Sequence, residues 1–260
     1  MTIHEPVDRL EVWLVKGRLN IVAAPGPCRV EVNDSGGTKL RLTADNGRLR
    51  LRHGRGRRWL AHLSWRRWAK RRSEITIGVP PQTVVDLRMN EANVTVSGLR
   101  ASTSVNVTSG RISLLGVGGT TTVKLVSGDV EAMRVSGELS MQTVSGDLAL
   151  AESSASKVRG KTISGTITCD LDEPLHTELA FHTISGDITL RIPAESDLAV
   201  ALRTASGRIT SSFAEIVDPG AKVFTNHAEG VLGRGTGKLT AATTSGDVSL
   251  LAGLGSDELG

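Results

Sequence analysis

The second half of the chain repeats one short phrase, a Ser-Gly pair followed by alternating apolar residues. The spacings between successive serines are 12, 18, 9, 9, 19, 21, 21 and 39. These spacings fit a short unit of about nine or ten residues and a longer period of about 19 to 21, and a fixed period of this kind is typical of a solenoid. The serines of the phrase are Ser97, Ser109, Ser127, Ser136, Ser145, Ser164, Ser185, Ser206 and Ser245.

Each unit has the pattern of a half-buried strand that follows a corner. Apolar residues lie three and five positions after the serine, as in Ile112 and Leu114 or Ile188 and Leu190, and this alternation places them on one face of a strand. Glycine permits the positive φ of a tight turn, and serine can hydrogen-bond to nearby backbone amides. We therefore expect coils of two short strands, stacked about 4.8 Å apart through parallel ladders.

The composition agrees with such a fold and excludes some functions. The chain has 4 Trp, 3 Phe and no Tyr, so 3% of it is aromatic against 39% hydrophobic, and any core must be aliphatic. Aromatic-lined sugar grooves and base-stacking platforms are therefore not expected. The 29 glycines favour many short strands joined by tight turns, and the sequence predicts an all-β protein.

The repeated phrase resembles a known family. The phrase consists of Thr, Val or Ile, then Ser-Gly, then a charged residue and an alternating apolar pair, and the section ITIGVPPQTVVDLRM (Ile75 to Met89) precedes it. This pattern is similar to bacterial β-strand-repeat proteins that carry an adhesin label, a family of domains of unknown function related in style to the head GIN domain. The resemblance extends from about Glu11 to Ala252. It implies a β-solenoid and no particular chemistry.

These observations predict a single-stranded parallel β-solenoid (β-helix) with an N-terminal hairpin cap. The expected divisions are a cap at residues 1–90 with a basic insertion at 53–73, a repeat region at 91–252 and a tail at 253–260. Inside the cap, Asn46-Gly47 is the strongest hairpin signal.

With a two-residue loop at Asn46-Gly47, Leu42 pairs with Leu51, Thr43 with Arg50, and Arg41 with Arg52. The two arginines then face each other on the exposed side. Such a pair is unfavourable by a few tenths to about 1 kcal/mol unless an anion or acidic partner lies against it. The alternatives are a longer loop that shifts the register, or side chains that splay into water.

Positive charge is concentrated near this hairpin. Residues 48–72 contain 11 Lys or Arg and no Asp or Glu, whereas the rest of the chain has 20 basic and 27 acidic residues. Three of the four tryptophans lie in the same segment, which suits an anionic membrane surface or an acidic protein partner. The alternatives are a hydrophobic lid over the solenoid end and, third, nucleic-acid binding. The candidate binding residues are Arg41, Arg50, Arg52, Arg57, Arg58, Trp59, Trp65, Arg66, Arg67, Trp68, Lys70, Arg71 and Arg72.

No catalytic, cofactor or metal motif is found in the sequence. The Asp residues at the repeat corners alternate with Arg, Glu or Thr in other copies, which argues against a calcium roll, and GVLGRGTGKLT (Gly230 to Thr240) fails the P-loop pattern. Cys28 and Cys169 are interpreted as buried, reduced thiols. An enzyme or a small-molecule substrate is therefore not expected. The alternative is a carbohydrate-active enzyme with Asp129 and Asp147 stacked about 5 Å apart on successive coils.

The sequence shows no apolar segment of the kind that directs export or spans a membrane. The N-terminus MTIHEPVDRL has no apolar run, and no stretch reaches the roughly 18 residues that span a bilayer. We therefore expect a cytoplasmic protein, peripheral at the inner membrane, that acts as a non-catalytic interaction scaffold. The sequence leaves its oligomeric state open.

Overall fold

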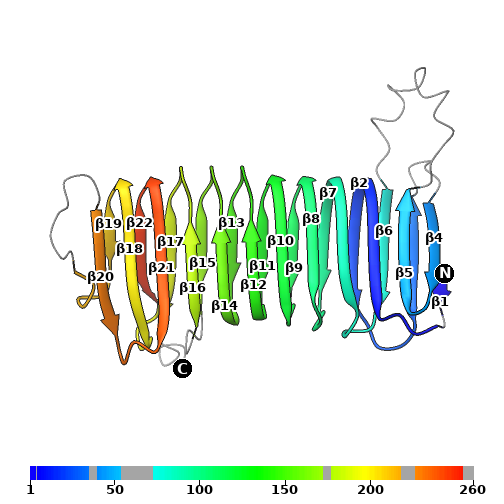
Figure 1. The fold of residues 1–260 in the computed structure, drawn as a ribbon, viewed down its shortest axis with the longest axis horizontal. Helices are drawn as coiled ribbons and strands as arrows, with labels where there is room; N and C mark the ends of the chain where they lie inside the picture. Colours follow the sequence, from blue (N-terminus) through cyan, green and yellow to red (C-terminus); the bar gives the residue numbers. More distant parts are fainter. Residues whose placement is uncertain (4, 35–39, 54–72, 172–176, 218–225, 254–260) are drawn as a thin grey trace, which may run out of the picture. The chain divides into compact units, whose positions relative to one another are not determined.

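The computed structural model describes residues 1–3, 5–34, 40–53, 73–171, 177–217 and 226–253, and the regular elements in these ranges are all β-strands. The predicted all-β class is confirmed. The chain divides into two compact units, Met1–Thr120 and Thr121–Gly260, which we describe separately as unit 1 and unit 2 (Figure 1).

Unit 1 is built around one long strand that has parallel neighbours on both sides. β2 pairs in parallel with β5 and β6 on one side and with β7 on the other, and β7 then pairs in parallel with β8 and β9. Antiparallel strands cover the end of the ladder, with β4 on β5, β3 on β6, and β1 on β3. The strands are β1 (Thr2–Ile3), β2 (Arg9–Ala23), β3 (Cys28–Asp34), β4 (Leu40–Asp45), β5 (Arg48–His53), β6 (Ser73–Val79), β7 (Val84–Ser97), β8 (Thr103–Ser109) and β9 (Ile112–Leu115).

Parallel pairing in unit 1 therefore begins at Arg9, well before the first Ser-Gly phrase. The N-terminal section was expected to form hairpins, and the antiparallel β4–β5 hairpin is one part of it. β2, β5 and β6 instead form coils of the solenoid. Their inward residues are the same aliphatic types as in the repeats, but they lack the phrase that marks a coil in the sequence. The expected boundary at residue 90 falls inside β7.

Unit 2 is a stack of coils in which each strand lies in register on the next. One ladder runs β12, β14, β16, β21 and β18, and another runs β11, β13, β15, β17, β22 and β19, all in parallel. β20 closes the first ladder in antiparallel fashion on β18. The strands are β10 (Thr120–Ser127), which begins at the unit boundary, β11 (Val130–Met133), β12 (Ser136–Gln142), β13 (Leu148–Ala151), β14 (Ser154–Lys161), β15 (Ile167–Asp170), β16 (Glu178–His182), β17 (Ile188–Pro193), β18 (Leu198–Ser206), β19 (Ile209–Ser211), β20 (Asn226–Leu232), β21 (Gly237–Ser245) and β22 (Val248–Gly253).

The coils do not follow one another strictly in chain order. In unit 2 the β21–β22 coil lies between the β16–β17 coil and the β18–β19 coil, as the red strands between yellow-green and yellow ones show in Figure 1. In unit 1 the β2 coil lies between the β5–β6 coil and β7. In each unit, the coil nearest a chain terminus is thus hydrogen-bonded on both sides.

The core is the predicted aliphatic stack. Leu148 pairs with Ile167, and Ile167 with Ile188, so the spacing between neighbouring coils is the long period of the phrase. The residues three and five positions after the serine are buried in every copy except those of Ser97 and Ser206, and Ile188 and Leu190 are 0% and 1% exposed. The predicted period and inward register are confirmed.

The two cysteines belong to this core. Both Cys28 and Cys169 are buried free thiols, as predicted. Burial raises the pKa of Cys28 to about 11. Burial, with a contribution from the neighbouring Asp170, also raises the pKa of Cys169. Both thiols therefore stay protonated at neutral pH and contribute as small apolar side chains.

The Ser-Gly corners stack directly on one another. In unit 2, parallel bridges join Ser127 to Ser145, Ser145 to Ser164, Ser164 to Ser185, and Ser185 to Ser245. At Gly165, φ is 151°, and a Cβ atom would lie 2.0 Å from the carbonyl oxygen of Gly146 on the neighbouring coil. Glycine is therefore required twice, by its backbone conformation and by the close approach of the next coil.

A buried threonine supports most of these corners, and the sequence patterns did not reveal it. The Thr143, Thr162 and Thr183 hydroxyls donate to the glycine carbonyl oxygens of the neighbouring coil at 3.5, 3.3 and 3.3 Å. Thr243 and Thr204 make the same bond at 3.1 and 2.9 Å. Each threonine lies two residues before the serine and points inward, where an unpaired hydroxyl would be costly. The repeat is thus better written Thr-x-Ser-Gly.

Replacing Thr162 with valine is expected to lower the free energy of unfolding by about 1 to 2 kcal/mol, because it removes one inter-coil hydrogen bond while keeping the side-chain shape. Urea unfolding followed by far-ultraviolet circular dichroism measures the change. Thr168→Val, at an exposed position of β15, is the matched control and should change stability by less than about 0.5 kcal/mol. Equal effects of the two substitutions would contradict the role of the buried hydroxyl.

Candidate anion-binding face

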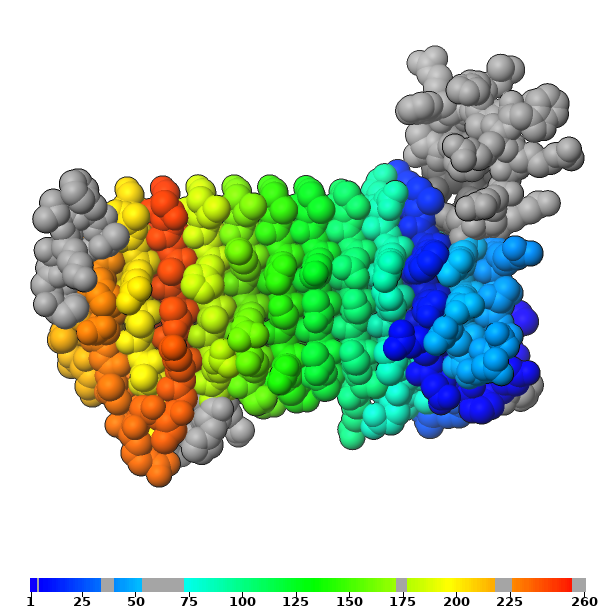
Figure 2. Space-filling model, in the orientation of Figure 1, coloured from blue at the N-terminus to red at the C-terminus, as the bar shows by residue number. Residues whose placement is uncertain are grey.

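A row of arginines crosses the outward face of unit 1. Arg41 of β4 lies opposite Arg52 of β5. Trp13 of β2 lies beside Arg52 on one side and beside Arg88 of β7 on the other. We name these four residues the arginine–tryptophan row. Figure 2 shows the atoms of β4, β5 and β2 meeting side by side, in light and dark blue. The row exists because the strands alternate, with leucine and valine inward and these residues outward.

Trp13 holds the centre of the row. The Arg52 guanidinium lies over its ring at 3.6 Å from the centroid, and the Arg88 guanidinium lies at 5.7 Å. Cation–π contacts of this kind contribute about 0.5 to 2 kcal/mol each. Trp13 remains 38% exposed, so the indole is both a platform for two guanidinium groups and an apolar surface open to a partner.

Two carboxylates of this face pair with arginines other than Arg41 and Arg52. Glu11 accepts a hydrogen bond from Arg50 at 3.0 Å and lies 3.6 Å from Arg48, while Asp86 pairs with Arg88 at 3.2 Å. Among the residues that the structure describes, Arg41 and Arg52 have no carboxylate partner, and the Nε of Arg52 is buried without a hydrogen-bond partner. Arg9 likewise has no carboxylate partner among these residues, but Arg41 and Arg52 are the two unmatched guanidinium groups that face each other across a ladder.

The face as a whole is cationic. Its outward positions carry six arginines against three carboxylates, a net charge of +3. The arginines are Arg9, Arg41, Arg48, Arg50, Arg52 and Arg88, and the carboxylates are those of Glu11, Asp45 and Asp86.

The hairpin prediction from Asn46-Gly47 is confirmed in its register. Arg41 faces Arg52, Leu42 faces Leu51, and Thr43 faces Arg50, because Asn46 and Gly47 both have positive φ (48° and 74°) and form a two-residue turn. The structure therefore brings Arg41, Arg50 and Arg52 onto one face. The other ten candidate residues lie outside the described part of the chain: Arg57, Arg58, Trp59, Trp65, Arg66, Arg67, Trp68, Lys70, Arg71 and Arg72.

Trp13 and Arg88 were missed by the sequence analysis. The signal that could have found Trp13 is the alternation of its own strand, where Leu10, Val12 and Leu14 point inward and leave Trp13 outward. The register of β2 between β5 and β7 was needed to place it beside Arg52 and Arg88.

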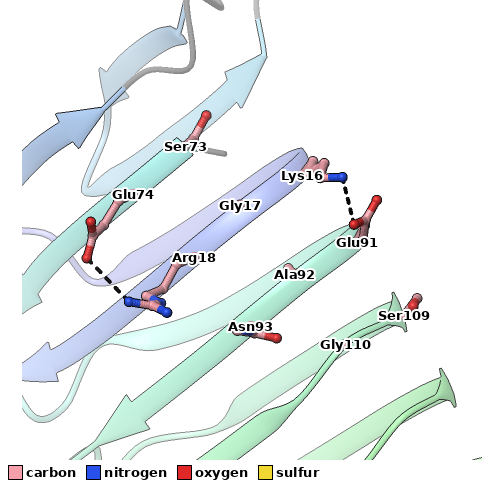
Figure 3. Close-up of a pocket in the computed structure, with 10 residues that line it drawn as sticks. All are labelled: Lys16, Gly17, Arg18, Ser73, Glu74, Glu91, Ala92, Asn93, Ser109 and Gly110. Atoms are coloured by element: carbon pink, nitrogen blue, oxygen red, sulfur yellow. Dashed lines mark ion pairs between the residues drawn. The ribbon is translucent and has the colours of Figure 1, made fainter. Parts of the chain in front are cut away.

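A hollow of about 370 Å³ lies elsewhere in unit 1, where β2, β6, β7 and β8 turn a corner (Figure 3). Its four charged side chains neutralise one another in pairs, with Lys16 2.7 Å from Glu91 and Arg18 3.8 Å from Glu74. The hollow therefore has no excess of either charge, and the arginine–tryptophan row is the stronger candidate for binding an anion.

The corner aspartates do stack, and their carboxylates serve the backbone. Asp129 Oδ1 accepts the backbone N–H of Asp147 at 3.2 Å, and Asp147 Oδ1 accepts that of Thr166 at 2.8 Å. Asp187 and Asp247 bond to the next coil in the same way, each at 2.8 Å. These carboxylates join neighbouring coils, a role that the sequence analysis did not predict.

Two features are absent from the described ranges, a cluster of metal ligands and a membrane-spanning helix. Across these ranges, no group of three or more His, Cys, Asp or Glu residues is arranged to hold a metal ion. Within the same ranges, no helix has the length and apolar character needed to cross a membrane.

Known proteins resemble the chain to different degrees. No curated protein sequence matches the chain significantly. A solved structure from Clostridium sporogenes ATCC 15579, whose description proposes a cell adhesion protein, aligns with 97% of this chain and 98% of its own at 9% identity, with a TM-score of 0.27. A sequence profile of the Toastrack DUF4097 family matches residues 23–251. Because this match covers most of the chain, the protein belongs to the Toastrack DUF4097 family, a family of domains of unknown function with a β-solenoid fold.

Proposed function

We propose that the protein is a non-catalytic, adhesin-like scaffold that docks on an anionic surface through the arginine–tryptophan row. The surface that suits the row best is the cytoplasmic leaflet of the inner membrane. The single observation that carries the proposal is the opposition of Arg41 and Arg52, two guanidinium groups with no carboxylate partner among the described residues.

The row combines the two interactions that a lipid headgroup region offers. Guanidinium groups form charge-assisted hydrogen bonds with phosphate, and each basic residue near an anionic leaflet contributes about 1 kcal/mol. An exposed indole lies well at headgroup depth. Trp13 and Arg52 present both groups from one rigid sheet, so little conformational entropy is lost on docking.

The basic segment at 53–73 belongs to the same proposal. This segment connects β5 to β6 and therefore begins directly after Arg52. Residues 54–72 lie outside the described part of the chain. We propose that its candidate residues extend the cationic surface that the row begins.

A scaffold fits the geometry better than a carbohydrate-active enzyme. The enzyme alternative needs a free carboxylate pair, and the stacked Asp129 and Asp147 each accept a backbone N–H from the next coil. A carboxylate oxygen that is already bonded to the backbone of the next coil has a fixed direction and is not free to contact a substrate.

Vesicle cosedimentation tests the proposal. Wild-type protein is expected to bind phosphatidylglycerol vesicles at low salt, and Trp13→Ala/Arg52→Gln is expected to bind about tenfold more weakly, because it removes one charge and one exposed indole. The matched control is Arg203→Gln/Val231→Ala on unit 2, which removes one exposed charge and one exposed apolar side chain and should bind like wild type.

Circular dichroism establishes that each variant is folded before it is compared. Failure of the wild type to bind anionic vesicles at low salt would overturn the proposal. So would binding to duplex or single-stranded nucleic acid alone with a steep salt dependence, which would favour a nucleic-acid partner instead.

A further inference from the structure

The strand β4 forms an open edge of unit 1. Among the described strands it pairs with β5 alone, and Figure 1 shows it at the end of its ladder. The other antiparallel strand at this end, β3, is covered on its far side by β1, where Val30 N–H donates to the Met1 carbonyl at 2.9 Å. An uncovered strand edge presents unpaired N–H and C=O groups and is a template for another strand.

β20, the end strand of the first ladder in unit 2, has a backbone partner on its outer side, whereas β4 has none among the described residues. Val217, which precedes β20 in the chain, pairs with Glu229 of β20 on the side that faces away from β18. The Val217 N–H donates to the Glu229 carbonyl at 3.1 Å, and the Glu229 N–H donates to the Val217 carbonyl at 3.0 Å. The described residues of unit 1 provide no such bond to β4. The same fold thus protects one end strand with its own chain and leaves the other exposed within the described ranges.

The turn defines which backbone groups of β4 face the open edge. In a two-residue hairpin, Asp45 C=O accepts the N–H of Arg48, so these residues form a hydrogen-bonded pair. Pairs alternate along an antiparallel ladder, so Thr43 and Arg41 also direct their backbone groups toward β5. The N–H and C=O groups of Leu40, Leu42 and Ala44 therefore point to the open edge.

The β4 sequence is complementary to itself in an antiparallel arrangement. Its segment reads Arg41-Leu42-Thr43-Ala44-Asp45, with opposite charges at equal distances from Thr43. When two copies pair with Thr43 opposite Thr43, Leu42 forms hydrogen-bonded pairs with Ala44 of the second copy. Arg41 then lies opposite Asp45 of the second copy, and this ion pair occurs twice. Shifting the register by two residues in either direction loses both ion pairs.

We propose that two copies of this chain associate through their β4 edges, in antiparallel register centred on Thr43. The occupant of the edge is a second copy because the charge pattern matches itself, and cross-strand Thr–Thr and Arg–Asp pairs each stabilise a ladder by about 0.2 to 1 kcal/mol. Because the two-fold axis is perpendicular to the sheet, the outward faces of both copies lie on the same side.

This inference does not depend on the proposed function, and it leaves Arg52 as the unmatched guanidinium group of the pair Arg41 and Arg52. In the pair, Arg41 is matched by Asp45 of the second copy, and Arg52, Trp13 and Arg88 of each copy remain turned to the same surface. Two linked docking faces bind a surface more tightly than either alone.

The test is the mass of the full chain in solution without lipid, measured by sedimentation equilibrium over a concentration series. Wild type is expected to approach twice the 27.5 kDa of one chain. Arg41→Asp and Asp45→Arg each place like charges opposite one another twice and should each weaken association about tenfold or more.

Mixing the two variants gives the decisive outcome. One copy then carries two aspartates and the other two arginines at these positions, so an equimolar mixture should dimerise like wild type. Ala44→Pro removes an N–H that points to the open edge, keeps the β5 pairing and should give a monomer with the circular dichroism spectrum of the wild type. A monomeric wild type, a dimer indifferent to all of these changes, or no recovery on mixing would each overturn the proposal.

Discussion

Replacing Gly165 with alanine is expected to lower the free energy of unfolding by about 4 kcal/mol or more. The added Cβ would lie 2.0 Å from the Gly146 carbonyl oxygen and 2.6 Å from its carbon. Both atoms are backbone and cannot rotate away. The stacked corner would have to open, and with it the bonds from Gly146 N–H to Ser164 and from Gly165 N–H to Ser185.

A second glycine separates the two causes of this effect. Gly116 also has a positive φ, of 60°, but a Cβ there would meet no atom within 4 Å. Gly116→Ala should therefore cost only the backbone term, about 1 to 2 kcal/mol. Urea unfolding of both variants gives the comparison. If Gly165→Ala costs no more than Gly116→Ala, the close stacking of the corners is not what selects glycine.

Ile188→Asp is expected to destabilise unit 2 by about 4 kcal/mol. Ile188 is completely buried, and its ladder neighbours are Ile167 and Val248, so a carboxylate there would have no polar partner on either side. Thermal and urea unfolding measure the loss. Thr168→Asp, at an exposed position of the neighbouring coil, should leave stability nearly unchanged. Wild-type stability of Ile188→Asp would show that the inward register is wrong.

The features that the sequence predicted are those that depend on local pattern. The Ser-Gly phrase identified the corners, the alternation after it identified Ile188 and Leu190 as core residues, and Asn46-Gly47 gave the register of β4 on β5. Each of these is determined within a short stretch of chain. The buried threonine ladder also recurs locally, and could have been found by extending the phrase toward the N-terminus as far as the threonine.

The order of the coils could not be predicted in this way. β2 pairs with β7 although β3, β4, β5 and β6 lie between them in the chain, and β17 pairs with β22 across β18 to β21. Most inward residues are aliphatic and similar in size, with Phe181 of β16 an exception, so few local signals select one neighbour over another. For the same reason the sequence placed Arg41 beside Arg52 but could not place Trp13 and Arg88 next to them.

The interleaved coils imply a late step in the folding of each unit. β2 leaves the ribosome before its parallel partners β5, β6 and β7, which are complete only when Ser97 has been synthesised. The β18–β19 coil pairs with the β16–β17 coil only through β21–β22, which are made after both. Contacts this distant in sequence close slowly. Nascent chains of this protein should therefore expose open ladders until the final coil inserts, and an arrested chain that stops before Gly237 should be a preferred substrate for chaperones and proteases.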